Sequence, residues 1–325
     1  MPKHAQATVA AVDQKLVDQF EQLLESDEVA LPVAAIEVLV GVIKRSRAAT
    51  MHGLDDELRN ARDDLLRFCT GNPKALHGRT SISLASGSEL FLRHVTRTFL
   101  EFSDFDLCKE QLLARGENFA SQSVSSRERI AALGHPFVRD SAVVLVHGRS
   151  RVVTALLQKA AAAGRDFSVL VPEGRPSCAG YVCATELAKA GIPVTIIADA
   201  TVAHKMESVD CVIVGAEGVM ENGGIINKIG TLGVACCAKA FHKPLYVAAE
   251  SFKFARLFPL DQKDLPDTHS SSETLEAPGG AMPPGVGAQS PACDYTPPGY
   301  ITLLFTDIGV LTPAAVSDEL IRLYQ

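Results

Sequence analysis

"VIVGAEGVMENGGIINKIGT", residues 212–231, begins as a buried strand and runs into an acidic residue, a double glycine and a polar segment. The apolar residues before Gly215 predict a strand that is covered on both faces. The glycines after it predict tight turns, and the pair Gly230-Thr231 predicts the start of a helix. A charged loop at the end of a buried strand suits a small charged ligand. The question is whether this place does chemistry or only binds.

The chain around this stretch alternates short apolar runs with helical segments from about residue 137 onward. Such alternation predicts an α/β fold, with a Rossmann-like parallel sheet covered by helices on both faces. A sheet of that kind binds its ligands at the carboxyl ends of the strands. The expected strands are 142–147, 167–171, 193–198, 210–214 and 244–249.

The first part of the chain shows a helical period instead. Val12, Leu16 and Phe20 lie on one helical stripe, and the run Gly71-Asn72-Pro73 is a clear helix stop. No strong strand signal occurs before residue 131. The sequence therefore predicts an all-helical domain over residues 1–131, followed by a Rossmann-like α/β domain over residues 132–325.

A segment rich in proline, glycine and serine interrupts the second domain. It spans 266–299 and has few apolar anchors, so we expect a disordered insertion at about 267–292. The fold is expected to resume at "YITLLFTDIGVLTPAAVSDELIRLYQ". Thr312 and Pro313 are typical of the cap and first residue of a final helix.

Composition limits the classes of function. The chain has 325 residues and a formal net charge of -7, which disfavours a broad nucleic-acid surface. The eight cysteines form no CxxC pair and no zinc spacing, so we expect reduced thiols and no metal site. The N-terminus lacks the apolar core of a signal peptide, and no apolar run is long enough to cross a membrane. We expect a cytoplasmic protein without a membrane partner.

The glycine-rich run has the residues of an anion site but no nucleotide motif. No GxGxxG follows a strand, and the spacing of a P-loop is absent. Backbone N–H groups at Gly230 and Thr231 are expected to face an anion, Lys228 to add a charge, and Asn227 to bind sugar hydroxyls. The alternative is a tight turn with an exposed lysine.

Other polar residues follow the remaining strands. Gly148 and Arg149 follow the first expected strand, Arg175 the second, Asp199 the third and Glu217 the fourth. The carboxyl ends of parallel strands meet at one edge of the sheet, so these residues are expected to share one pocket. Taken singly, each is more often a solvated loop residue or a helix cap.

His147 is a candidate general base at the end of the first strand. A lone histidine there is more often packed and hydrogen-bonded. No GxSxG nucleophile motif is present.

Four segments together resemble the alpha subunits of eukaryotic translation initiation factor 2B. They are "SISLASGSELFLRHV", "PEGRPSCAGY", "GAEGVMENGGIINKIGT" and "YITLLFTDIGVLTPAAVSDELI". The resemblance covers nearly the whole chain apart from about 267–292. That family is similar to sugar-phosphate isomerases, among them methylthioribose-1-phosphate isomerase.

The resemblance implies which parts of an isomerase site this chain keeps. Those isomerases carry a catalytic cysteine after the first strand in an "HCNAG"-like run, where this chain has "HGRSR" with Gly148. They carry an aspartate in "GAD", where this chain has "GAE" with Glu217, whose side chain is one methylene longer. The "NKIGT" run is intact. Glycine does no acid–base work, so the pocket is expected to bind and sense without turnover.

The resemblance also implies a role and partners. It implies a non-catalytic regulatory subunit of the guanine nucleotide exchange complex for translation initiation factor 2. Its partners would be a second copy in a homodimer through the α/β domain, the other subunits of initiation factor 2B, and the phosphorylated alpha subunit of initiation factor 2.

The helical domain is expected to help detect that phosphorylation, through exposed arginines such as Arg59, Arg62, Arg93 and Arg97. We expect no cofactor, and a sugar phosphate, a nucleotide phosphate or a sulfate-like anion as the pocket ligand. Two alternatives stay open, an active sugar-phosphate isomerase and a scaffold with an empty pocket.

Overall fold

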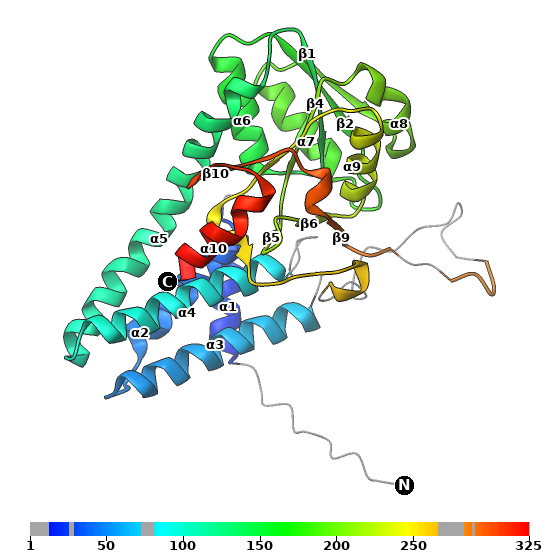
Figure 1. The fold of residues 1–325 in the computed structure, drawn as a ribbon. Coiled ribbons are helices and arrows are strands. Elements are labelled where there is room, and N and C mark those ends of the chain that lie inside the picture. The colour runs from blue at the N-terminus through cyan, green and yellow to red at the C-terminus, as the bar shows by residue number, and fades with distance from the viewer. Residues whose placement is uncertain (1–12, 26–28, 73–80, 266–282, 288–289, 325) are drawn as a thin grey trace.

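The computed structural model describes residues 13–25, 29–72, 81–265, 283–287 and 290–324. Figure 1 shows a bundle of helices from the first part of the chain packed below a mixed α/β part. We call these parts the helical half and the α/β half. The predicted α/β fold class is confirmed, with a parallel sheet that has helices on both faces.

The helical half forms because its apolar residues recur at helical spacing around one core. Leu16, Phe20 and Leu24 of the first helix are buried, and the second helix is apolar nearly all round because it lies at the centre. Asp13 and Thr50 cap the starts of the first and third helices with their side chains. The helices are α1 (Gln14–Leu24), α2 (Leu31–Arg45), α3 (Met51–Gly71), α4 (Ile82–Glu101) and α5 (Phe105–Gly134).

The main sheet has seven strands in the order β11-β10-β7-β4-β1-β2-β3, and β11 alone runs antiparallel to its neighbour. The five strands expected from the sequence all occur within one or two residues of their predicted ends. The strands are β1 (Ala142–His147), β2 (Phe167–Pro172), β3 (Val194–Ile197), β4 (Cys211–Gly215), β7 (Leu245–Ala248), β10 (Leu303–Thr306) and β11 (Gly309–Leu311).

Helices cover both faces of this sheet. One face packs against α6 (Arg151–Ala162), α7 (Ala179–Lys189) and the end of α5. The other packs against α8 (Val202–Lys205), α9 (Thr231–Ala240) and α10 (Val316–Tyr324). Helix α5 runs without a break from the bundle onto the sheet, where Ile130 and Ala131 join the sheet core. The two halves therefore share one long helix (Figure 1).

A second, smaller sheet was not predicted. Its order is β8-β5-β6-β9, with β5 antiparallel to β6 and β6 antiparallel to β9. Two of these strands, β5 and β6, lie in the segment for which the sequence predicted only a glycine-rich turn. The four are β5 (Gly218–Met220), β6 (Ile225–Lys228), β8 (Phe254–Ala255) and β9 (Cys293–Thr296).

The predicted insertion at 267–292 lies largely outside the described residues. Its described parts, 283–287 and 290–292, contain no helix or strand. At the end of the chain Thr312 precedes a single 3-10 turn, Pro313–Ala315, and α10 follows. Val316 and Leu320 are buried on the inner face of α10.

Candidate functional site

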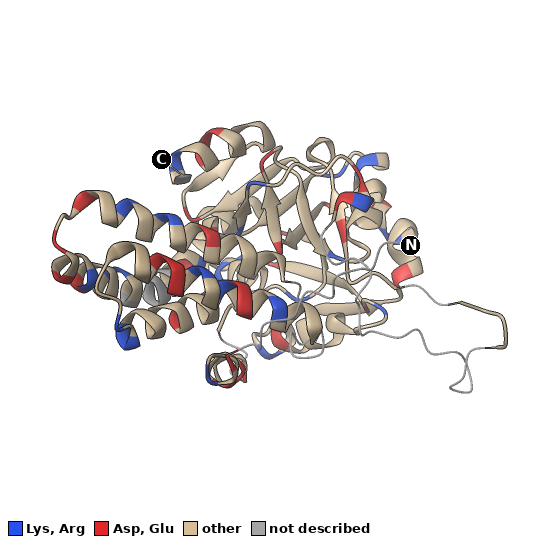
Figure 2. Ribbon diagram, turned by 90° about the horizontal axis from the view of Figure 1, so that it is seen from below, with Lys and Arg blue, Asp and Glu red and all other residues tan. Residues whose placement is uncertain are grey.

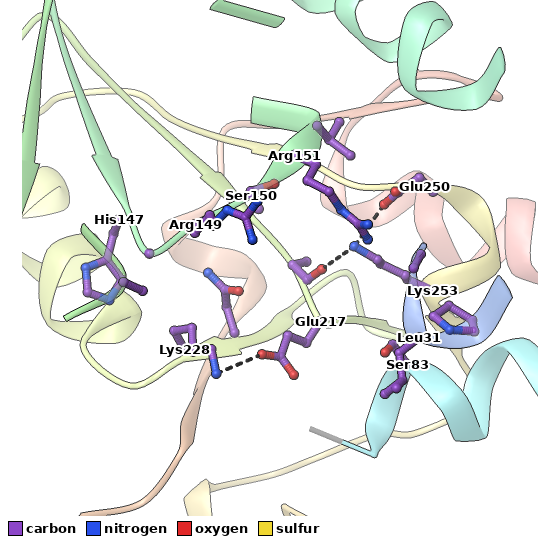
Figure 3. Close-up of a pocket in the computed structure, with 18 of the residues that line it drawn as sticks. Leu31, Ser83, His147, Arg149, Ser150, Arg151, Glu217, Lys228, Glu250 and Lys253 are labelled. Atoms are coloured by element: carbon purple, nitrogen blue, oxygen red, sulfur yellow. Dashed lines mark hydrogen bonds and ion pairs between the residues drawn. The ribbon is translucent and has the colours of Figure 1, made fainter. Parts of the chain in front are cut away.

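A cavity of about 480 Å³ lies at the carboxyl ends of β1 and β4. This is where the chain order of the sheet reverses, which is the usual place for a ligand in such folds. Figure 3 shows side chains from both sheets pointing into it. Gly148, Arg149, Glu217, Asn227 and Lys228 line it, as the sequence predicted. Its other polar lining residues are Ser83, His147, Ser150, Arg151, Ser177, Glu250 and Lys253.

The β5–β6 hairpin positions the acidic and basic residues of the opening stretch. The Glu217 N–H donates to the Ile226 carbonyl at 2.9 Å, so the two strands hold Glu217 opposite the end of β6. The Lys228 ammonium lies 3.6 Å from the Glu217 carboxylate (Figure 3). Both side chains are largely buried, with 20% and 14% exposed. Their charges are therefore less screened than on an open surface.

The turn after β7 supplies a second ion pair. Glu250 is buried, and its carboxylate lies 2.9 Å from the Lys253 ammonium. Lys253 also donates to the Ala216 carbonyl at 3.0 Å, directly beside Glu217. Burial opposes the ionisation of Glu250, but the charges of Lys253 and Arg151 outweigh it and lower the pKa of Glu250. Glu250 is therefore an anion that these cations hold in place.

The start of α6 forms the third wall. Ser150 caps the helix by accepting from the Val153 N–H at 3.4 Å, and a Cβ on Gly215 would lie 2.5 Å from the Ser150 hydroxyl. A side chain at residue 215 would therefore push β4 away from this cap. Gly148 has a φ of +70°, a conformation that favours glycine. Arg149 pairs with Glu186 of α7 at 2.6 Å, which ties the cavity rim to that helix.

His147 is packed rather than placed for proton transfer. It is 5% exposed, and its Nε2 donates to the Ile229 carbonyl at 2.9 Å. Burial lowers the pKa of His147, against the opposing effects of that bond and of Asp199. The ring is therefore neutral near pH 7 and forms a wall of the cavity.

The start of α9 differs from its expected role. The Gly230 and Leu232 N–H groups both donate to the Asp294 carboxylate of β9, at 2.8 and 3.1 Å. This corrects the expectation that the Gly230 amide faces a ligand, because a carboxylate of the chain already lies at the helix N-terminus. Thr231 is fully buried, and its hydroxyl donates to the Lys228 carbonyl at 2.6 Å. Thr231 thus fixes the end of β6 and does not line the cavity.

Arg175 lies elsewhere. Arg175, Asp199 and Gly230 line a second cavity of about 330 Å³, between the ends of β2 and β3 and the start of α9. Arg175 is mostly exposed and pairs with Glu173 at 3.1 Å, while Asp199 accepts from the Gly174 and Arg175 N–H groups. The predicted residues are thus divided between two cavities, and His147 lines both.

The helical half closes the main cavity. Ala30, Leu31 and Pro32 at the start of α2 line it, together with Ser83 of α4. A Cβ on Gly87 would lie 2.4 Å from the Pro32 side chain, so α4 approaches α2 closely at this point. This wall was not predicted, because only residues at strand ends were expected to line the pocket.

Four cationic side chains and two carboxylates line the cavity (Figure 3). An excess of positive charge in a partly closed space favours an anion, and the carboxylates can accept hydrogen bonds from hydroxyl groups. Sequence reasoning also missed Arg151, Glu250 and Lys253. The same rule would have found Glu250 and Lys253, since they follow the fifth predicted strand.

No group of three or more His, Cys, Asp or Glu side chains among the described residues is placed to hold a metal ion. Among those residues no helix has both the length and the apolar character to cross a membrane.

The fold and the cavity define a class of protein, a doubly wound α/β protein with a charged ligand site at the strand ends, closed by an N-terminal helical region. The Initiation factor 2 subunit family matches residues 25–313, and the chain belongs to that family.

Three curated proteins are similar to this chain along most of its length. "Translation initiation factor eIF2B subunit alpha" of Dictyostelium discoideum is 47% identical over 95% of this chain and 96% of that protein. The protein of the same name from Caenorhabditis elegans is 34% identical over 96% and 99%. "Ribose 1,5-bisphosphate isomerase" of Pyrococcus furiosus is 31% identical over 90% and 87%.

A solved structure shares the fold. A chain of the tetrameric eIF2B-beta2-delta2 complex of C. thermophilum matches with a TM-score of 0.72, over 95% of this chain and 94% of that chain. Its sequence identity is 20%, so this likeness concerns the fold alone.

Proposed function

We propose that this chain is a non-catalytic regulatory subunit of the guanine nucleotide exchange complex for translation initiation factor 2, and that it acts in the cytoplasm. The observation that carries the proposal is the 47% identity to an eIF2B alpha subunit over 95% of the chain. Its partners are the other subunits of initiation factor 2B and the phosphorylated alpha subunit of initiation factor 2.

The geometry of the main cavity supports one part of this proposal, the binding of an anionic ligand. Its cations suit a phosphorylated sugar, a nucleotide phosphate or a sulfate-like anion, and no cofactor is required. The Lys253 ammonium has three N–H groups and two acceptors among the described residues, Glu250 and Ala216. Its third N–H is free to bind a phosphate oxygen.

An active sugar-phosphate isomerase is the second candidate. The 31% identity to a ribose 1,5-bisphosphate isomerase favours it. Gly148 argues against it, because the resemblance to isomerases requires a cysteine there and glycine supplies no reacting group. A cysteine at residue 148 would also have to adopt a φ of +70°, which is strained for any residue with a Cβ.

One experiment separates three possibilities. Ribose 5-phosphate is titrated into the protein in a calorimeter, and conversion of ribose 1,5-bisphosphate and of methylthioribose 1-phosphate is then assayed. Binding of ribose 5-phosphate without conversion supports the proposal. Conversion of either substrate supports the isomerase, and no binding leaves a scaffold with an empty pocket.

We also propose a homodimer through the α/β half. The apolar residues in 301–311 do not support a dimer interface, because Leu304, Phe305 and Leu311 are buried within one chain. The support comes from Phe258 and Leu260, which are 62% and 81% exposed in the loop after β8. A stable interface would bury about 1,600 Å². A monomer in sedimentation at tens of micromolar would contradict the dimer.

The helical half would carry the response to phosphorylation. Its basic and acidic residues are interspersed along the helices (Figure 2). Arg62 and Arg93 both pair with Glu89, Arg97 pairs with Glu101, and Arg59 with Asp55. A phosphoserine would therefore have to compete with carboxylates for these arginines.

Arg93→Ala with Arg97→Ala, in the full chain and the rebuilt complex, should keep nucleotide exchange and lose inhibition by the phosphorylated substrate. Arg165→Ala, on the α/β half, is the matched control. Undiminished inhibition in the double variant would mean that these two arginines are not part of the sensor.

A further inference from the structure

Asp307 lies outside the cavity but holds one of its walls. It occupies the turn between β10 and β11, and is half-buried there. One carboxylate oxygen accepts from the Ser251 N–H at 2.6 Å. The other accepts from the Ser251 hydroxyl at 2.9 Å and from the Ser126 hydroxyl of α5 at 3.2 Å. Three donors from two distant segments therefore converge on this one carboxylate.

The turn that carries Asp307 is itself fixed. Thr306 donates its hydroxyl to the Gly309 carbonyl at 2.6 Å, and accepts from the Gly309 N–H at 3.1 Å. These two bonds close the hairpin on either side of Asp307. The carboxylate is thus held by a rigid element of the main sheet.

The other side of this network is the cavity wall. Ser251 opens the short turn η5 (Ser251–Lys253), which places Glu250 and Lys253 in the cavity. Phe252 between them is buried against Val33 of α2 and Ala30, which directly precedes that helix. Asp307 therefore fixes the backbone from which the Lys253 side chain extends to Glu250 and Ala216.

We propose that Asp307 is a positioning residue for Lys253, and that it sets the affinity of the cavity for a phosphorylated sugar without touching the ligand. This inference rests on the proposed function of the cavity. The lysine side chain is long and flexible, so its ammonium binds an oxyanion well only when the backbone beneath it is held.

Two variants of Asp307 distinguish an effect of its hydrogen bonds from an effect of its negative charge. In Asp307→Asn the amide oxygen can accept from the Ser251 N–H, and the amide NH₂ can donate to the two serine hydroxyls, which rotate. Positioning therefore survives although the negative charge is lost. In Asp307→Ala all three bonds are lost.

The test measures ribose 5-phosphate binding to the full chain by calorimetry. We expect Asp307→Ala to weaken binding about tenfold and Asp307→Asn to stay within about twofold of the wild type. In a Lys253→Ala background, Asp307→Ala should have no further effect, because it acts through that lysine. A residue that merely stabilised the fold would lower the melting temperature and leave the dissociation constant of the folded protein unchanged.

Two further variants keep the test decisive. If Asp307→Ala does not fold, Ser251→Ala replaces it in the test. Ser251→Ala removes a single hydrogen bond and should give a smaller loss of affinity for ribose 5-phosphate. Asp318→Ala, on the exposed side of α10, is the control and should bind as the wild type does. Equal binding by Asp307→Ala and the wild type, or an undiminished loss in the Lys253→Ala background, would overturn the inference.

A wild type that does not bind ribose 5-phosphate would instead contradict the proposed role of the cavity as a phosphorylated-sugar site. Hydrogen exchange then still tests the positioning role. Amides of residues 250–254 should exchange faster in Asp307→Ala than in the wild type, and equal exchange would overturn the inference without any ligand.

Discussion

The Lys228 ammonium and the Glu217 carboxylate lie 3.6 Å apart across the β5–β6 hairpin, inside the charged cavity. The two residues come from the same short stretch of sequence, and the hairpin turns them toward each other. The pair has two consequences. Glu217 holds the lysine at the cavity wall, and it competes with any anionic ligand for that lysine.

Lys228→Ala should weaken the binding of ribose 5-phosphate by about 1.5–3 kcal/mol. The variant removes a charge-assisted contact to the phosphate. It also leaves the negative charge of Glu217 without the neutralising effect of Lys228, and that charge repels the phosphate. Calorimetry measures the change. Lys159→Ala, on the exposed end of α6, is the matched control and should bind normally. Binding that is indifferent to Lys228 would contradict the assignment of the anion to this cavity.

Glu217→Gln should have the opposite effect and tighten binding by about 1 kcal/mol. The amide keeps the shape of the side chain but no longer neutralises the Lys228 ammonium. The same titration measures this change. Weaker binding in the variant would show that the carboxylate accepts hydrogen bonds from the sugar and matters more as an acceptor than as a competitor.

Gly148→Ala should lower the free energy of unfolding by about 1–2 kcal/mol, because the left-handed φ of +70° is costly for a residue with a Cβ. Space is not the reason, since the nearest side-chain atom to a new Cβ is 3.5 Å away on Lys228. Urea unfolding measures the change. Gly233→Ala, in open space within α9, is the control and should stabilise the fold by about 0.5–1 kcal/mol. Equal effects of both variants would contradict this account.

Stability should fall between acidic and neutral pH because of Asp294. Burial raises the pKa of its carboxyl to about 7, although the bonds from the Leu232 and Gly230 N–H groups lower it. In the unfolded chain the pKa is about 4, so the folded protein holds this proton more tightly. The stability that Asp294 contributes is full below about pH 4 and is lost as the pH rises toward 7.

Asp294→Asn removes this titration. The free energy of unfolding of the wild type, minus that of the variant, should therefore be larger at about pH 5 than at about pH 8. Urea unfolding at both pH values measures it, with Asp318→Asn on the exposed face of α10 as the control. A difference that does not change with pH would show that Asp294 does not titrate in this range.

Much of the architecture is local in origin and was readable from the sequence. A strand buried on both faces needs a continuous apolar run, and a helix needs apolar residues at a period near 3.6, so both leave a mark in a few consecutive residues. The five predicted parallel strands, the helical first half and the start of α9 at Thr231 followed from such marks. So did the placing of Gly148 and Glu217 at strand ends, since parallel strands end at a common edge.

The tertiary structure alone decided what these residues face. Asp294 lies 64 residues beyond Gly230 in the chain, yet its carboxylate accepts from the Gly230 N–H that was expected to face a ligand. Arg175 follows β2 but lines a second cavity, and the Ser251 N–H at the start of the turn that carries Lys253 donates to Asp307, 56 residues later. Such pairings arise when distant segments pack. A three-residue strand such as β5 is too short for its own residues to predict which strand it pairs with. The sequence therefore determined where the site is, and the packing of distant segments determined which groups are free in it.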